Sequence, residues 1–122
     1  MDGLEILEYR GTDYKPVVYF EGWRVAYLNY SDRFDPEKID TLERHMKTDE
    51  VFVLLEGKAS LLIGEEGELC PMERFKTYNV KKGVWHSIVT SRDAHVLIVE
   101  NADTDDANSE FMPLVHEGAY PL

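Results

Sequence analysis

The chain has 122 residues, of which 24 are acidic and 13 are basic, so its formal net charge is −11. A chain of this length forms one domain and can bury a core without disulfide bonds, and we interpret residues 1–122 as a single domain. A surface of this charge repels phosphate backbones and anionic lipids, which argues against nucleic acid and membranes as partners.

The sequence contains one cysteine, Cys70, which cannot form a disulfide bond within the chain. It shows neither the pattern of a secretory signal nor an apolar run long enough to cross a membrane. We therefore expect a cytoplasmic protein. Cys70 is predicted to lie in a loop without an adjacent base, which gives no case for nucleophilic catalysis.

Short apolar runs between turn residues predict β-strands at 16–20, 23–30, 50–55, 59–63, 78–80, 86–90 and 94–100. Between the second and third runs, Asp35-Pro36 can begin one helical turn. No segment keeps a 3.6-residue apolar stripe, so we predict an all-β fold of two antiparallel sheets, a sandwich or barrel, with no long helix. The barrel core is expected at about 17–100. Residues 101–122 are expected to form an irregular tail, in which 111–115 pack as an apolar strap or a dimer contact.

Four side chains stand at spacings that can bring them together inside such a barrel. Glu43 and His45 are two residues apart, so on a strand they project from the same face. Glu50 lies an odd number of residues beyond His45, so residues 47–49 must form a bulge or turn if the three are to converge. His86 follows a glycine-led turn at Gly83 and belongs to another hairpin.

Two imidazoles and two carboxylates form a mixed nitrogen and oxygen site that suits a divalent metal such as Zn, Mn, Fe or Ni. We therefore interpret His45, Glu50, His86 and Glu43 as candidate metal ligands. The same side chains can instead form a metal-free hydrogen-bonded network, because buried charges need such partners anyway. We expect the remaining histidines, His95 and His116, to be surface or packing residues.

These residues also carry a resemblance to a known family. His45, Glu50 and Gly57 match the second half of the first cupin motif, and Gly83 and His86 match the Gly-x-x-His of the second. The chain thus resembles a small single-domain cupin from about residue 23 to residue 101. The resemblance implies a jelly-roll barrel (a double-stranded β-helix), usually dimeric, in which three histidines and one glutamate often hold a metal.

The sequence departs from the cupin motifs at three positions. Glu43 stands where the first motif has its leading histidine, Lys81 replaces the proline of the second motif, and Thr90 stands where an asparagine usually follows. The fold expectation rests on strand and turn positions and is unaffected. The change at Glu43 gives the expected metal site harder oxygen character.

Two functions are compatible with this pattern. The first is a metal-dependent cupin enzyme acting on a small metabolite, and the second is a metal-free module that binds a small ligand such as a sugar or an organic acid. Convergence of Glu43 with the other three side chains favours the first, whereas pairing of Glu43 with Arg44 or Lys47 favours the second.

Further polar side chains are candidates for the barrel mouth: Arg24, Tyr27, Asn29, Tyr78 and Lys81. The outward apolar positions of 51–55 and of the tail predict a homodimer.

Overall fold

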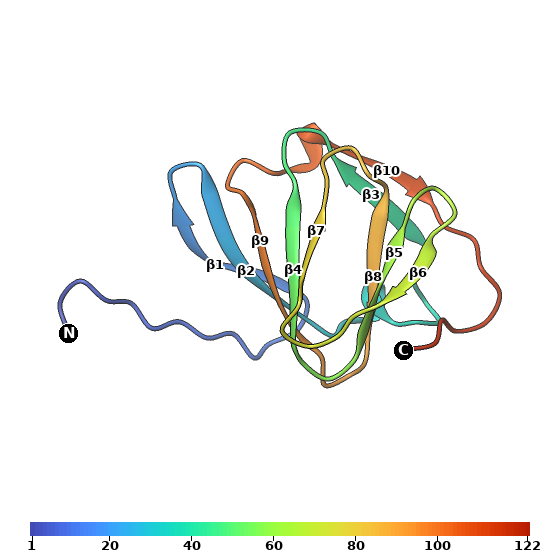
Figure 1. The fold of residues 1–122 in the computed structure, drawn as a ribbon, viewed down its shortest axis with the longest axis horizontal. Helices are drawn as coiled ribbons and strands as arrows, with labels where there is room; N and C mark the ends of the chain where they lie inside the picture. Colours follow the sequence, from blue (N-terminus) through green and yellow to red (C-terminus); the bar gives the residue numbers. More distant parts are fainter.

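The computed structural model describes residues 1–122 and consists of two five-stranded antiparallel sheets (Figure 1). The first sheet has the strand order β1-β2-β9-β4-β7, with bounds β1 (Tyr14–Phe20), β2 (Trp23–Asn29), β9 (His95–Asn101), β4 (Glu50–Glu56) and β7 (Thr77–Val80). The second has the order β10-β3-β8-β5-β6, with bounds β10 (Ser109–Pro113), β3 (Thr41–His45), β8 (His86–Thr90), β5 (Ala59–Ile63) and β6 (Glu68–Pro71).

The predicted all-β architecture of two antiparallel sheets is confirmed. The two helical elements are the 3₁₀ helices η1 (Asp32–Phe34) and η2 (Asp106–Asn108), each of three residues, so the structure holds no membrane-spanning helix. The helical turn predicted at Asp35-Pro36 is present as a single turn, because the Ile39 N–H donates to the Asp35 carbonyl over 3.0 Å. Ahead of β1 the chain first follows β2, where Asn29 Nδ2 donates to the carbonyls of Tyr9 and Gly11, and its N-terminal end runs away from the sheets as an extended arm (Figure 1).

Two local expectations were wrong. Cys70 lies in strand β6 and not in a loop, because residues 68–71 pair with β5. Residues 109–113 of the expected irregular tail form strand β10, which pairs with β3 from Ser109 opposite His45 to Pro113 opposite Thr41. Both segments lie at a sheet edge. There, backbone hydrogen bonds to one neighbouring strand stabilise a strand even though its sequence shows no strong apolar alternation.

The main core lies between the two sheets and follows the pleat of the strands. In the first sheet, the strand register aligns Ala26, Ile98 and Phe52 in one inner layer, and each of them is almost fully buried. The inner face predicted for β4 is confirmed, because Glu50, Phe52 and Leu54 are buried while the alternate residues are only half-buried. Apolar burial of this kind contributes about 25 cal/mol per Å².

A second, smaller cluster covers the outer face of the second sheet. Leu42, Leu62 and Val89 from the sheet pack with Ile39 and with Leu114 from the C-terminal segment. The segment after β10 therefore acts in part as the predicted apolar strap, through Leu114. Its neighbours Phe111 and Val115 remain exposed.

The connection from β3 to β4 passes from one sheet to the other and thereby sets the geometry of the candidate site. The turn predicted at 47–49 is present, and it resolves the odd spacing between His45 and Glu50 because the two residues belong to opposite sheets. Asp49 fixes this crossing by accepting the Lys82 N–H over 2.9 Å. The Gly83 N–H donates to the His45 carbonyl over 2.8 Å, which ties the two motif segments together. Gly83 has a φ of +80°, a conformation that favours glycine.

Candidate functional site

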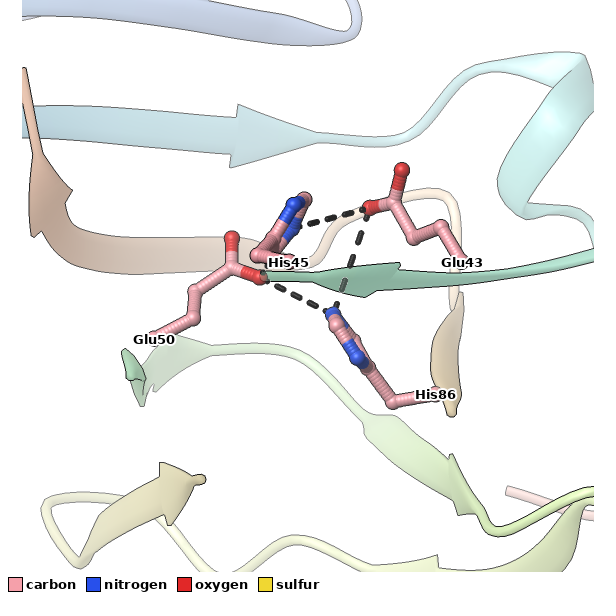
Figure 2. A group of neighbouring side chains, drawn as sticks. All are labelled: Glu43, His45, Glu50 and His86. Carbon is pink, nitrogen blue, oxygen red and sulfur yellow. Dashed lines mark hydrogen bonds and ion pairs between the residues drawn. The ribbon is translucent and has the colours of Figure 1, made fainter. Parts of the chain in front are cut away.

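The four predicted side chains do converge, from three strands of two sheets (Figure 2). Glu43 of β3 stands directly opposite His86 of β8 in the strand register, and His45 lies two residues further along the same face of β3. Glu50 enters from the first residue of β4, on the opposite sheet. One donor atom from each residue lies within 4.8 Å of the others, and we call this group the histidine–glutamate cluster.

Glu50 is the centre of the cluster. Its Oε1 lies 3.0 Å from His45 Nε2 and 2.9 Å from His86 Nε2. The Oε1 of Glu43 is more distant, at 3.7 Å from His45 Nε2 and 4.0 Å from His86 Nε2. The side chains of Glu50 and His86 are only 7% and 2% exposed, whereas that of Glu43 is 38% exposed. Glu43 therefore lies on the open side of the cluster.

Each imidazole is oriented by a second partner on its other nitrogen. His86 Nδ1 lies 3.0 Å from the Val84 carbonyl oxygen, and His45 Nδ1 lies 2.8 Å from Ser109 Oγ on β10. A carbonyl oxygen only accepts, so His86 Nδ1 carries a proton and donates it there. Both Nε2 atoms are consequently the ones turned towards Glu50.

The charges of the cluster are strongly coupled. Burial raises the pKa of the Glu50 carboxyl, but the hydrogen bonds and charges of the two imidazoles outweigh burial and hold its pKa at about 2. Burial lowers the pKa of both imidazoles, but the hydrogen bond and charge of Glu50 outweigh it and raise the pKa of His45 and of His86. The pKa of Glu43 is raised by desolvation and then by the Glu50 charge.

The cluster lines a cavity of about 200 Å³ that also receives side chains from β1, β2, β9, η1 and the segment from 104 to 111. In the first sheet, Arg24 of β2 pairs with Glu100 of β9. Val51 of β4 pairs with Val99 of β9, so the next residues along these two strands, Glu50 and Glu100, also lie side by side. Arg24, Glu100 and Glu50 thus form a charged row that replaces the apolar layer of the core at this end. Tyr14 Oη donates to Glu100 Oε1 over 2.5 Å.

Of the further donors predicted for the barrel mouth, only Arg24 lines this cavity. Tyr27 and Asn29 lie on the opposite face of β2 from Arg24, where Tyr27 stacks on His95 with ring centroids 4.6 Å apart and Asn29 Oδ1 lies 2.6 Å from His95 Nδ1. Tyr78 instead accepts a hydrogen bond from the Glu73 N–H. His95 is therefore a packing histidine, as predicted.

Sequence reasoning missed several residues of the cavity, among them Tyr14, Glu100 and Ser109. For Glu100 a signal existed. It ends a strongly apolar strand at a position whose side chain faces the core, and a charged residue there needs a buried partner. Ser109 carried no such signal, because its role depends on the unexpected pairing of β10 with β3.

Comparisons with known proteins identify the fold. No protein-family model and no curated protein sequence matches the chain. Solved structures do match: a cupin-2 domain protein from Shewanella frigidimarina has a TM-score of 0.61 and 17% identity, covering 76% of this chain and 84% of that one. An RmlC-like cupin from Desulfovibrio desulfuricans has a TM-score of 0.59 and 17% identity, covering 83% of this chain and 96% of that one.

A third similar structure is a variant of Streptomyces PAC13 with uridine, which has a TM-score of 0.63 and 11% identity and covers 88% of this chain and 85% of that one. At sequence identities this low, the structural similarities establish the fold and not the activity. Together with the two antiparallel sheets and the position of the histidine–glutamate cluster between them, they show that this chain has the fold of a small cupin.

Proposed function

We propose that the chain binds one divalent metal ion through His45, His86 and Glu50, with Glu43 as the fourth ligand, and that the ion acts on a small metabolite in the adjacent cavity. The observation that carries the proposal is the orientation of the imidazoles. Both Nε2 atoms face one carboxylate oxygen, and both Nδ1 atoms are held by other partners. Metal-bound histidines are usually fixed in this way through their second nitrogen.

The proton position on His86 supports a positive charge in the cluster. His86 Nδ1 donates to Val84, so the Nε2 of a neutral His86 carries a lone pair. That lone pair lies 2.9 Å from a carboxylate oxygen of Glu50, an atom that also only accepts. Two acceptors repel each other at this distance unless a positive charge lies between or upon them. A metal ion supplies that charge, and so does a proton on the imidazole.

The donor set fits a divalent metal in size and chemistry. Two donors at about 2.1 Å from one ion lie about 3.0 Å apart at a right angle and about 4.2 Å apart when opposite. The distances from the two Nε2 atoms to the glutamate oxygens run from 2.9 to 4.0 Å and so lie close to that range. Two imidazoles with two carboxylates suit Zn, Mn, Fe or Ni.

A bound metal would supply a Lewis acid that polarises an oxygen of the metabolite. The chain contributes the surroundings of that oxygen. Phe52 and Ile98 form an apolar layer directly below Glu50 and Glu100 and exclude water from that side. Glu43, the most exposed member of the cluster, faces the side from which a ligand enters.

Metal titration of the purified chain and of a His86→Ala variant tests the proposal. We expect one ion per chain in the wild type and loss of most of the affinity in H86A, and thermal unfolding of H86A is recorded first because His86 is a fully buried side chain. A His116→Ala variant is the control, since His116 contacts the backbone carbonyls of Ile39 and Gly118 outside the cavity. Equal metal binding by wild type and H86A would reject the site.

The pH dependence of binding gives a second readout. Protons compete with the metal for the imidazoles, so affinity falls as the pH drops through their pKa values. Glu50 raises both values above the ordinary 6.5, so the loss should begin at a higher pH than for isolated histidines.

One observation favours the alternative of a metal-free binding module. If both histidines are protonated, they satisfy Glu50 without any metal, and the cavity still lies beside them. The structure of PAC13 with uridine shows a small hydroxylated ligand in a protein of similar fold. Small-ligand binding that is unchanged by a chelator, in a chain that takes up no metal, would favour this alternative.

A further inference from the structure

A second carboxylate, Glu100, lies in the same cavity and takes no part in the histidine–glutamate cluster. Its side chain is 3% exposed, and its Oε1 accepts hydrogen bonds from Tyr14 Oη over 2.5 Å and from Arg24 Nη2 over 2.8 Å. Arg24 Nε also contacts the same oxygen, at 3.2 Å. One oxygen is therefore fully occupied and rigidly held.

The other oxygen of Glu100, Oε2, is buried and has no hydrogen-bond partner within the chain. An unpartnered buried carboxylate oxygen is costly, and such groups in folded proteins call for a partner. The three donors on Oε1 fix the carboxylate in place, so Oε2 cannot turn to find one elsewhere. Glu100 lines the cavity, so a donor for Oε2 can be supplied by a molecule bound there, whether water or a ligand.

The chemistry of that partner follows from the charges around it. A carboxylate oxygen accepts hydrogen bonds, so it selects a donor and repels a second carboxylate. Arg24 already neutralises the Glu100 charge, which removes the attraction for an ammonium group. Neutral donors remain, namely hydroxyl groups, amide N–H groups and water. The aromatic side chains of Tyr14, Phe34 and Phe111, which also line the cavity, suit the C–H faces of a sugar-like chain.

We propose that Glu100 binds a hydroxyl group of the ligand in this cavity. The ligand is a small polyhydroxylated molecule, and its other end lies at the histidine–glutamate cluster. This inference rests on the proposed function for the end at the cluster. It assigns the end at Glu100 independently. The carboxylates at the two ends of the cavity, Glu50 and Glu100, have different electrostatic environments. Burial and the Glu50 charge raise the pKa of Glu100, whereas the two histidines lower the pKa of Glu50.

Two matched five-carbon acids test the proposal. D-Xylonate has one carboxylate end and one hydroxyl end, whereas xylarate has a carboxylate at both ends. We expect the zinc-loaded wild type, titrated by NMR at about pH 8 so that free carboxyls are ionised, to bind xylonate at least about tenfold more tightly than xylarate. In Glu100→Gln, the amide oxygen can keep the bonds from Tyr14 and Arg24, and the amide N–H₂ becomes a donor at the position of Oε2. The preference should then fall to about twofold or reverse.

The controls separate this inference from the proposed function. Glu66→Gln removes the same charge from an exposed turn and should keep the wild-type preference. Zinc binding by wild type and E100Q is measured in parallel, and E100Q should bind zinc as the wild type does. If no variant binds zinc, the proposed metal function fails, and the same titrations in EDTA then compare wild type with E100Q directly, so the test of Glu100 does not depend on the metal.

Three outcomes would overturn the assignment of Glu100: a wild type that prefers xylarate, a preference that E100Q leaves unchanged, or no binding of either acid with or without zinc. Thermal unfolding of E100Q is recorded first, and if that variant does not fold, the wild-type ratio of xylonate to xylarate affinity decides alone.

Discussion

Replacing Glu50 with glutamine in the metal-free protein tests the charge balance of the histidine–glutamate cluster. The Glu50 side chain is 7% exposed and accepts from both imidazoles through a single oxygen. Its pKa is held at about 2, against an ordinary value of 4.5. At about 1.4 kcal/mol per pKa unit, this shift corresponds to about 3 kcal/mol of stability.

The sign of the effect depends on pH. The pKa of Glu50 is lower in the folded than in the unfolded chain, so its contribution is present above pH 4.5 and is lost as the pH falls towards 2. The histidine pKa values are raised on folding, so their contribution is complete below pH 6.5 and is lost as the pH rises through the folded values. Stabilisation by the network is therefore greatest between these limits. Above the histidine values Glu50 keeps one donor, because a neutral His45 can donate through Nε2–H while its Nδ1 accepts from the Ser109 hydroxyl, but it loses the His86 donor and both positive charges.

Urea unfolding with EDTA at about pH 5.5 and about pH 9 measures this difference, because the raised imidazole pKa values keep both rings charged at the lower pH, and their charge decreases as the pH rises. We expect E50Q to be less stable than the wild type by about 3 kcal/mol at the lower pH, and the difference to be smaller at the higher pH. Glu66→Gln, which removes an exposed charge, should change stability by less than about 0.5 kcal/mol at both. A stability difference between E50Q and wild type that does not vary with pH would refute the charge assignment.

Three further outcomes are expected. Ser109→Ala should weaken metal binding by about tenfold, measured by competition with a chelating dye, because it removes the partner that orients His45. Gly57→Ala should destabilise the chain by more than about 2 kcal/mol in urea unfolding, because Gly57 has a φ of +72° and a Cβ there would meet Ala94 Cα at 2.7 Å. Gly64→Ala is the control: Gly64 has a φ of +85° but open space around it, so this change should cost only about 1–2 kcal/mol. Sedimentation equilibrium should give a homodimer of twice the 14.1 kDa chain mass, because the extended arm and the edge strands expose apolar side chains that a monomer would leave in water.

The fold was predictable because its signals are local. Alternation in β4 and the turn glycines Gly57 and Gly83 fixed which residues face inward and where hairpins close, and the register of the sheets agrees with both. Strands β6 and β10 were missed because edge strands pair on one side only, so solvent-facing polar residues hide the alternation that identifies a central strand.

The candidate site was predictable only in part, for a physical reason. His45, Glu50 and His86 are adjacent to the turns that place them, so their convergence follows from short-range spacing. Glu100 and Tyr14 meet through pairings between strands more than eighty residues apart in sequence, and no local pattern encodes such a contact. The same holds for Ser109, which reaches His45 only because β10 returns to β3.

Anomalous X-ray diffraction from crystals grown with zinc, recorded at the zinc edge, tests the metal proposal most directly. We expect one strong peak between His45 Nε2, His86 Nε2 and the Glu50 carboxylate, with Glu43 turned towards it, and no peak at this position in crystals of H86A. A peak elsewhere on the chain, or none in the wild type while the two imidazoles remain bonded to Glu50, would contradict the metal site.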